Sequence, residues 1–406
     1  MRMLAFALDP LEEKMSTAIS LLIFILILGI VVFVHEFGHF IMARRAGIFV
    51  EEFAMGMGPK LLTFRGKKKS QHPREGEEDV TLYTLRALPL GGFCKMRGME
   101  ESITGDPEAM NNKGLFDRIL VIVGGSGMNF VLALVLFTIL NFLVGYTSTQ
   151  AIVVANDSPA QRAGLQNGDH ITHINGSRVT LWENFRFTLD MNAGAPMDVR
   201  VNRGGERVNL TITPERGADG VYRIGMNPAL RVGFLQRNLP GAEALERTTV
   251  VSSIGNSAET IGFHIRAPFR MLARFLTRQP VPEGSGVIGI VGLGELVTQE
   301  FQTTMQAEQH AVRNTIIQML NIAAIISVAL GVMNLLPIPA LDGARLVFLL
   351  VEGIRRKPVS PEREGMVHLV GFAVLIALII FITYRDIANI VTRNNGTQYE
   401  ESYHQP

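Results

Sequence analysis

The sequence predicts a polytopic α-helical membrane protein with four transmembrane helices, a membrane-associated β-hairpin or sheet, and one extracytoplasmic domain. Of its 406 residues, 47% are hydrophobic and only 18% are charged, which is typical of a membrane protein. Four apolar runs are long enough to cross a bilayer, and β-prone runs lie between them. We expect the transmembrane segments at residues 16–43, 117–146, 313–345 and 366–391.

The first transmembrane segment ends in a pattern of ionisable side chains. Residues 16–34 contain no charged residue and nearly span the hydrocarbon core as a helix. The run then continues directly into HEFGH at residues 35–39. Ionisable groups at the edge of a membrane span are costly, so they usually mark an ion path, a proton relay or a catalytic centre. Residues 1–15 precede this segment as an N-terminal extension, and Met15 would be an equally good start.

The spacing within HEFGH favours a metal site. On a helix, His35 and His39 are about 400° apart, so both rings leave the same face. Glu36 lies about 100° further round than His35, where it can reach a metal-bound water rather than the metal. Zinc suits two nitrogens with one carboxylate oxygen, and a catalytic site leaves the fourth position to water. The alternative is a chance HExxH pattern, as found on the surface helices of soluble proteins.

A third ligand has to come from elsewhere in the chain, and Asp342 is the best candidate. It lies just past the charge-free run 315–340, as Glu36 lies just past the first run. Pro337 and Pro339 break regular helix there, which is tolerated at membrane depth only where the backbone is buried in protein or lines a wet cavity. The alternative for Asp342 is an N-cap or a turn before Gly343.

Taken together, three motifs resemble the site-2 protease family of intramembrane zinc metalloproteases. They are HEFGH, GSGMNF at residues 125–130 and NLLPIPALDG at residues 334–343. The bacterial branch with a PDZ domain, typified by the regulator of sigma-E protease, is the most similar. The resemblance implies Zn²⁺ on His35, His39 and Asp342, with Glu36 as the general base.

The resemblance also implies the substrate class. Its members perform regulated intramembrane proteolysis of single-span membrane proteins, such as anti-sigma factors or remnant signal peptides, already shortened by another protease. We therefore expect transmembrane-segment protein substrates and membrane lipid as partners. Asn129, Asn334 and Pro337 are the implied substrate-binding residues; helix packing or an interhelical hydrogen bond is the alternative for Asn129.

Basic residues fix the predicted topology. Arg44, Arg45 and the run 67–69 follow the first span closely, which places residues 44–116 on the cytoplasmic side. Both ligand motifs then lie at the cytoplasmic ends of their spans, and residues 346–365 form a second cytoplasmic loop. Residues 392–406 form a C-terminal tail. We expect a protein of the bacterial cytoplasmic (inner) membrane, with its active site toward the cytoplasm.

The sequence of residues 44–116 predicts a β-rich region. We expect strands at residues 48–65 and 79–96, punctuated by glycine and proline. A peptide bond inside a helix is accessible only after the helix unwinds, and an exposed sheet edge could hold the unwound segment as an added strand. The alternative is a hairpin that only caps the helices.

Residues 158–179 look like the core of a PDZ domain, which we place at residues 147–214, outside the cytoplasm. Such domains bind extended peptides by strand addition, and here the domain could instead exclude substrates with bulky ectodomains. Residues 215–312 form a region C-terminal to it, where residues 242–276 predict an amphipathic helix on the membrane surface or against the PDZ domain. His368, alone in the fourth span, is interpreted as a packed or snorkelling residue rather than a fourth ligand.

Composition excludes several other classes of protein. A net charge of +1, with no basic stripe, gives no reason to expect a nucleic-acid partner. The single cysteine, Cys94, excludes an intrachain disulfide and a cysteine metal cluster. Two other functions stay open: a zinc or proton transporter that uses the same His, Glu and Asp, and an inactive scaffold that presents the PDZ domain.

Overall fold

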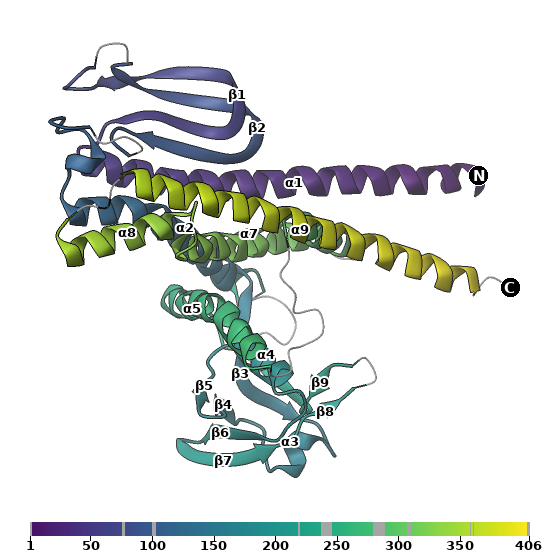
Figure 1. The fold of residues 1–406 in the computed structure, drawn as a ribbon. Helices are drawn as coiled ribbons and strands as arrows, with labels where there is room; N and C mark the ends of the chain where they lie inside the picture. Colours follow the sequence, from purple (N-terminus) through teal and green to yellow (C-terminus); the bar gives the residue numbers. More distant parts are fainter. Residues whose placement is uncertain are drawn as a thin grey trace. The chain divides into compact units, whose positions relative to one another are not determined.

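The computed structural model describes residues 2–74, 78–99, 103–217, 220–236, 246–278, 289–306, 310–357, 359 and 361–403. The chain forms two compact units (Figure 1). Unit 1 consists of Met1–Ala133 and Val287–Pro406, and unit 2 of Leu134–Gly286. Helix α2 (Leu115–Leu143) contributes to both units.

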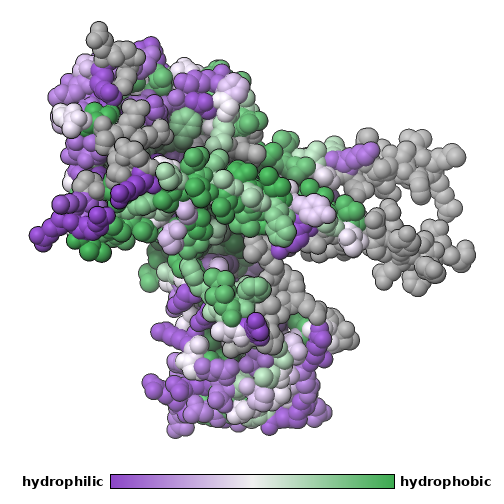
Figure 2. Space-filling view, in the orientation of Figure 1, coloured by the Kyte–Doolittle hydropathy of each residue, from purple (hydrophilic) through white to green (hydrophobic). Residues whose placement is uncertain are grey.

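Unit 1 contains the helices that are long and apolar enough to cross a membrane. The four candidate spans are Lys14–Arg45, Leu115–Leu143, Ala311–Leu335 and Arg363–Thr392, and hydrophobic side chains gather over the helices of this unit (Figure 2). These spans belong to α1 (Arg2–Arg45), α2, α7 (Ala311–Leu335) and α9 (Pro361–Tyr403). The protein is therefore an integral membrane protein with four candidate spans, as predicted. Helix α1 includes the segment predicted as an N-terminal extension, and α9 includes much of the predicted tail.

A shorter helix, α6 (Ile290–Met305), also packs inside unit 1. It shares an apolar core with α1 and α7, in which Phe24, Val297 and Ile322 are buried. Its first turn is held by α9, because the buried Asp386 carboxylate accepts hydrogen bonds from the backbone N–H groups of Gly289 (2.9 Å) and Gly292 (3.0 Å). A carboxylate at a helix N-terminus satisfies two of the free amides there.

Helices α1 and α2 approach closely at a pair of glycines. A Cβ atom on Gly38 would lie 2.7 Å from the Gly124 carbonyl carbon, and one on Gly124 would lie 2.9 Å from the Gly38 oxygen. Neither position has room for a side chain, so the two backbones touch directly. This contact brings the second half of α1, where HEFGH lies, against the first half of α2.

Strands β1 (Val50–Lys69) and β2 (Val80–Met96) each bend and pair antiparallel. Phe53 pairs with both Tyr83 and Cys94, whereas Phe64 pairs with Tyr83 from the other side. The first half of β1 therefore lies between the two halves of β2, and residues 91–96 form one edge of the resulting sheet. Helix α1 packs against β2. The strands fall where the sequence predicts β structure.

The chain between α7 and the next helix differs from the prediction. Residues 313–345 were expected as one transmembrane segment and 346–365 as a loop, but α7 ends at Leu335 and α8 (Asp342–Arg355) follows after a short loop. Proline at 337 and 339 lacks the amide hydrogen that would continue α7. Helix α8 forms because it is amphipathic: Ala344 and Leu349 are buried, whereas Arg355 is exposed.

Unit 2 is built on a six-stranded sheet. Five strands form a continuous path in the order β10-β3-β4-β6-β7, and β5 pairs with β4. The same unit contains helices α3 (Pro159–Arg162) and α4 (Trp182–Met191), and the short strands β8 and β9 pair with each other outside this sheet. The strands are β3 (Gly145–Val154), β4 (His170–Ile174), β5 (Ser177–Arg178), β6 (Met197–Arg203), β7 (Glu206–Ile212), β8 (Glu215–Arg216), β9 (Tyr222–Arg223) and β10 (Met226–Val232), with η2 (Phe234–Gln236) after them.

Residues 158–179, which the sequence predicts as the core of a PDZ domain, form a short helix and two short strands. Ser158 caps α3 (Pro159–Arg162) by accepting a hydrogen bond from the Gln161 amide, and Asn175 and Gly176 take positive φ between β4 and β5. The unit's core nevertheless extends beyond residues 147–214, because β10 pairs with β3 and Ile224 and Met226 join the buried cluster.

Helix α5 (Val250–Leu276) corresponds to the amphipathic helix predicted at 242–276; residues 242–245 lie outside the described residues. Within unit 2 it packs against α4 (Trp182–Met191). The rings of Phe187 and Phe263 meet edge to face with centroids 5.6 Å apart, and Arg270 donates to Asn184 Oδ1 at 3.4 Å. The sequence left two positions open for this helix, the membrane surface and the face of the extracytoplasmic domain. The structure shows a contact with the folded part of unit 2.

The ion pair between the buried Asp169 carboxylate and the partly exposed Arg203 provides a test of the stability of unit 2. Asp169 is fully buried and accepts hydrogen bonds from Arg203 (2.7 and 2.8 Å) and from the Gln166 amide. Burial alone would raise the pKa of Asp169, but these hydrogen bonds outweigh it and hold the pKa below its usual range. We expect Asp169→Asn to destabilise unit 2 by about 3 kcal/mol, because it leaves Arg203 without its anion.

The urea midpoint followed by Trp182 fluorescence measures this effect, since Trp182 is the sole tryptophan and lies in unit 2. The wild-type contribution is present above about pH 4 and is lost as the pH falls through the lower folded-state pKa. The variant should lack this acid dependence. Asp198→Asn, at an exposed position in the same unit, is the control. An unchanged midpoint in Asp169→Asn would contradict the assignment.

Candidate metal centre and active site

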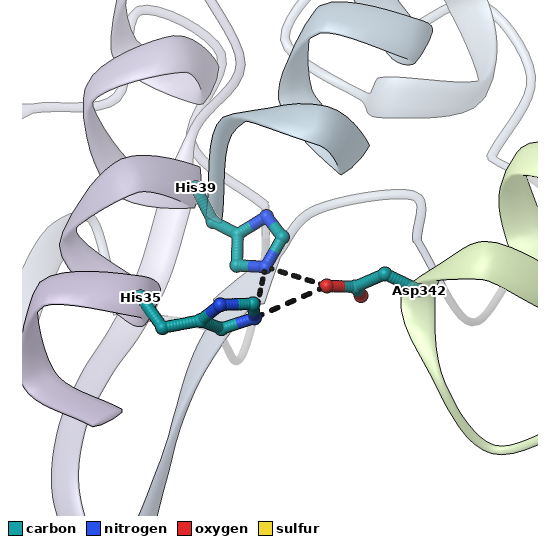
Figure 3. Close-up of side chains that lie close together, drawn as sticks. All are labelled: His35, His39 and Asp342. Carbon is teal, nitrogen blue, oxygen red and sulfur yellow. Dashed lines mark hydrogen bonds and ion pairs between the residues drawn. The ribbon is translucent and has the colours of Figure 1, made fainter. Parts of the chain in front are cut away.

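Three side chains converge where α1 meets the start of α8 (Figure 3). His35 and His39 lie one turn apart on α1, each 5% exposed, and their Nε2 atoms are 3.2 Å apart. Asp342 Oδ2 lies 3.2 Å from His35 Nε2 and 3.0 Å from His39 Nε2. The structure thus brings together the three residues that the sequence predicts as ligands, although Asp342 is more than 300 positions away in the chain.

The spacing of these three atoms fits a small tetrahedral cation. With bonds of about 2.0–2.1 Å, the ligand atoms of a tetrahedral zinc site lie about 3.3 Å from one another. The three observed separations of 3.0–3.2 Å are close to that value. Two imidazoles and one carboxylate are also a donor set that zinc accepts in catalytic sites. The chemistry and the geometry of the residues both fit zinc.

The outer nitrogen of each imidazole is held as a metal-binding histidine requires. His39 Nδ1 donates to the Val121 carbonyl oxygen at 2.8 Å. The Asn129 side-chain amide lies 3.2 Å from His35 Nδ1, and its Oδ1 atom is buried without a hydrogen-bond partner among the described residues. With the amide turned over, Oδ1 accepts from a protonated Nδ1. Both rings then present Nε2 with its lone pair toward Asp342.

Helix α2 closes the site from behind with a glycine. A Cβ atom on Gly125 would lie 2.8 Å from His35 Nε2 and closer still to His39 Nε2. Two residues along, the same addition at Gly127 would meet nothing within 4 Å. In the sequence, Gly125 is only the first residue of the GSGMNF motif; the structure adds that its missing side chain makes room for the histidines.

Glu36 is half-buried and faces a cavity of about 710 Å³ that also opens onto His35, His39 and Asp342. The edge strand 91–96 forms one wall, and a Cβ on Gly92 would lie 3.3 Å from Glu36 Cγ. The carboxylate therefore lies close to the edge strand 91–96 and lines the same cavity as the two histidines. A group placed there can exchange a proton with water or peptide held beside the three ligands.

Of the three residues predicted to bind substrate, one lines the cavity and two do not. Asn334 lines the cavity, whereas Asn129 is fully buried behind His35 and does not line it. Pro337 is exposed in the loop before α8 and is not among the lining residues.

Cys94 lines the same cavity. Burial raises the pKa of its thiol well above its usual range, and the nearby Glu36 carboxylate adds to this effect. The thiol therefore stays protonated at neutral pH.

Comparison with known proteins identifies the family. The family model of Peptidase family M50 matches residues 23–378, which include both histidines, Glu36 and Asp342. The chain belongs to this family, the site-2 proteases, and is a zinc metalloendopeptidase of that type. The resemblance, the enzyme class and the zinc cofactor predicted from the sequence are thereby confirmed.

Curated relatives match over nearly their whole length. A Clostridium acetobutylicum protein provisionally assigned as a zinc metalloprotease is 32% identical over 371 residues, which cover 91% of this chain and 97% of the relative. The zinc metalloprotease RasP of Geobacillus kaustophilus is 28% identical, with 92% of this chain and 98% of the relative covered. RasP of Shouchella clausii is 29% identical, with 91% and 99% covered.

The glycine behind the site gives a direct test of its geometry. In Gly125→Ala the added methyl would occupy the space beside the two Nε2 atoms, so we expect zinc affinity to fall about tenfold or more. Gly127→Ala, on the same helix with open space around it, is the matched control. Zinc content after dialysis against a graded chelator measures both. Equal zinc retention in the two variants would show that the ions bind elsewhere.

Proposed function

We propose that this protein is an intramembrane metalloendopeptidase that performs regulated intramembrane proteolysis of single-span membrane proteins, such as anti-sigma factors or remnant signal peptides. The observation that carries the proposal is the convergence of His35, His39 and Asp342 beside Glu36. The two histidines and Glu36 are on α1, which is long and apolar enough to cross a membrane. Family membership supports the peptidase chemistry, and the position of the site supports a substrate that is itself in the membrane.

Each residue of the site has a proposed role in peptide-bond hydrolysis. His35 and His39, with Asp342, hold zinc, which supplies Lewis acidity and lowers the pKa of water. Glu36, beside these ligands and facing the cavity, accepts a proton from the attacking water and donates it to the leaving amine. Burial of the histidines in the apolar bundle keeps bulk water away from their hydrogen bonds. Asn334, which lines the cavity, is placed to contact the substrate.

The edge strand 91–96 is the proposed docking surface for the unwound substrate. It forms a wall of the cavity that contains Glu36, and it is an edge of its sheet. A substrate segment added as a further strand would regain the backbone hydrogen bonds that it loses on unwinding, and its peptide bonds would lie beside Glu36. This arrangement favours a strand clamp over a hairpin that only caps the helices.

We assign residues 147–214, together with the later strand β10, to a PDZ domain outside the cytoplasm. The basic residues that follow α1 support a cytoplasmic location for residues 44–116, and hence an active site toward the cytoplasm in the bacterial inner membrane. The substrates would reach the site after another protease has shortened them.

Glu36→Gln tests the proposed general base. We expect kcat/KM for a tagged single-span reporter to fall about 10³-fold, because the amide cannot accept the proton from water. Zinc content should stay unchanged, since Glu36 is outside the ligand set. Glu295→Gln, on helix α6 and hydrogen-bonded to Gln299, is the matched control and should cleave normally. Wild-type cleavage by Glu36→Gln would refute the assignment, and zinc uptake into vesicles without cleavage would favour a transporter.

Asn129→Ala separates two roles for Asn129. Because its amide lies against His35 rather than in the cavity, we expect the variant to bind zinc about 10- to 100-fold more weakly at an unchanged KM. Asn141→Ala, on the same helix, should retain normal zinc affinity, since Asn141 bonds to Ser257 in unit 2. A raised KM with normal zinc affinity would instead assign Asn129 to the substrate.

A further inference from the structure

Helix α9 lies largely outside the packed core of unit 1. Most described side chains of its apolar stretch are exposed, among them Leu369 (70%), Ile380 (64%) and Phe381 (63%). Its contacts with the rest of unit 1 are therefore local, and one of them falls on the loop that connects α7 to α8. That loop ends at Asp342, so a helix remote from HEFGH touches the segment that delivers the third ligand.

The contact is a hydrogen bond to the backbone of this loop. The Ala340 N–H donates to His368 Nδ1 at 3.0 Å. Nδ1 must therefore be unprotonated, so the ring hydrogen is on Nε2, which lies 3.8 Å from a Glu364 oxygen. The His368 ring also lies 6.0 Å from the ring of Phe348 on α8, so it touches both the loop and the helix that follows.

The loop holds Ala340 in a backbone conformation that is unfavourable for alanine. Ala340 has φ of +75°, in the left-handed region where a Cβ atom is disfavoured. A bond to the Ala340 amide opposes relaxation toward ordinary backbone angles. Since Asp342 follows two residues later, relaxation at Ala340 would change the direction in which α8 starts.

A second contact on the next turn of α9 supports the first. A Cβ atom on Gly371 would lie 2.7 Å from Pro339 Cγ and closer still to Pro339 Cβ. The proline ring therefore packs directly on the α9 backbone. Two consecutive loop residues, Pro339 and Ala340, are thus held by two adjacent turns of one helix.

We infer that His368 is a positioning residue for the metal site: through the Ala340 amide it holds the loop in the conformation that presents Asp342 to His35 and His39. The inference rests on the proposed role of Asp342 as a zinc ligand. It differs from the sequence interpretation of His368, which was a packed or snorkelling side chain, because the ring accepts a specific backbone hydrogen bond.

The test compares three variants of the full chain in detergent. His368→Ala removes the acceptor and should lower zinc affinity about tenfold in a chelator competition, with KM for the reporter unchanged. In His368→Asn, Oδ1 can take the place of Nδ1, so this variant should recover most of the lost affinity. Leu369→Ala, at the adjacent residue, 70% exposed, should match wild type.

Wild-type zinc affinity in His368→Ala would overturn the inference. So would a His368→Asn variant no better than His368→Ala, because that result assigns His368 to packing alone. Gly371→Ala, which keeps the hydrogen-bond acceptor but displaces Pro339, should also weaken zinc binding, and normal binding there would count against the account. If His368→Ala fails to fold, His368→Asn and Gly371→Ala decide. A wild-type protein that binds no zinc would instead refute the proposed function itself.

Discussion

The burial of two imidazoles and a carboxylate at one point of an apolar helical bundle is the constraint on which the rest of unit 1 depends. Such groups are costly in a membrane unless each is paired or bound to a cation. His35, His39 and Asp342 meet this requirement by facing one another within 3.2 Å. The outer nitrogens of the two imidazoles have separate partners, the Val121 carbonyl and the Asn129 side chain.

The surrounding elements are arranged so that this cluster can form. Glycines at 38 and 124 let α1 and α2 touch, and the missing side chain at Gly125 leaves room for the histidine rings. On the other side, α7 ends before the cluster, and a short loop starts α8 at Asp342. The sheet edge 91–96 then lies beside Glu36, whose carboxylate faces the cavity. The three proposed zinc ligands, the proposed general base and the proposed docking strand thereby border one cavity.

The sequence predicts those features that depend on local spacing. HEFGH places two histidines on one helix face whatever the rest of the fold, and the motif around Asp342 supplies the third ligand through family resemblance. Features set by long-range packing could not be predicted. The β10–β3 pairing joins residues 72 to 87 positions apart, and the contacts of Asn129 and His368 depend on how helices meet. No periodicity in the sequence encodes these contacts.

The central claim is that His35, His39 and Asp342 hold zinc, and the zinc K-edge X-ray absorption spectrum of the purified full-length protein tests it most directly. The account predicts one zinc per chain with only nitrogen and oxygen neighbours at about 2.0–2.1 Å, including the multiple-scattering signature of two imidazoles. A sulfur neighbour at about 2.3 Å would place Cys94 on the metal and contradict the ligand set. A spectrum without imidazole scattering would contradict it as well.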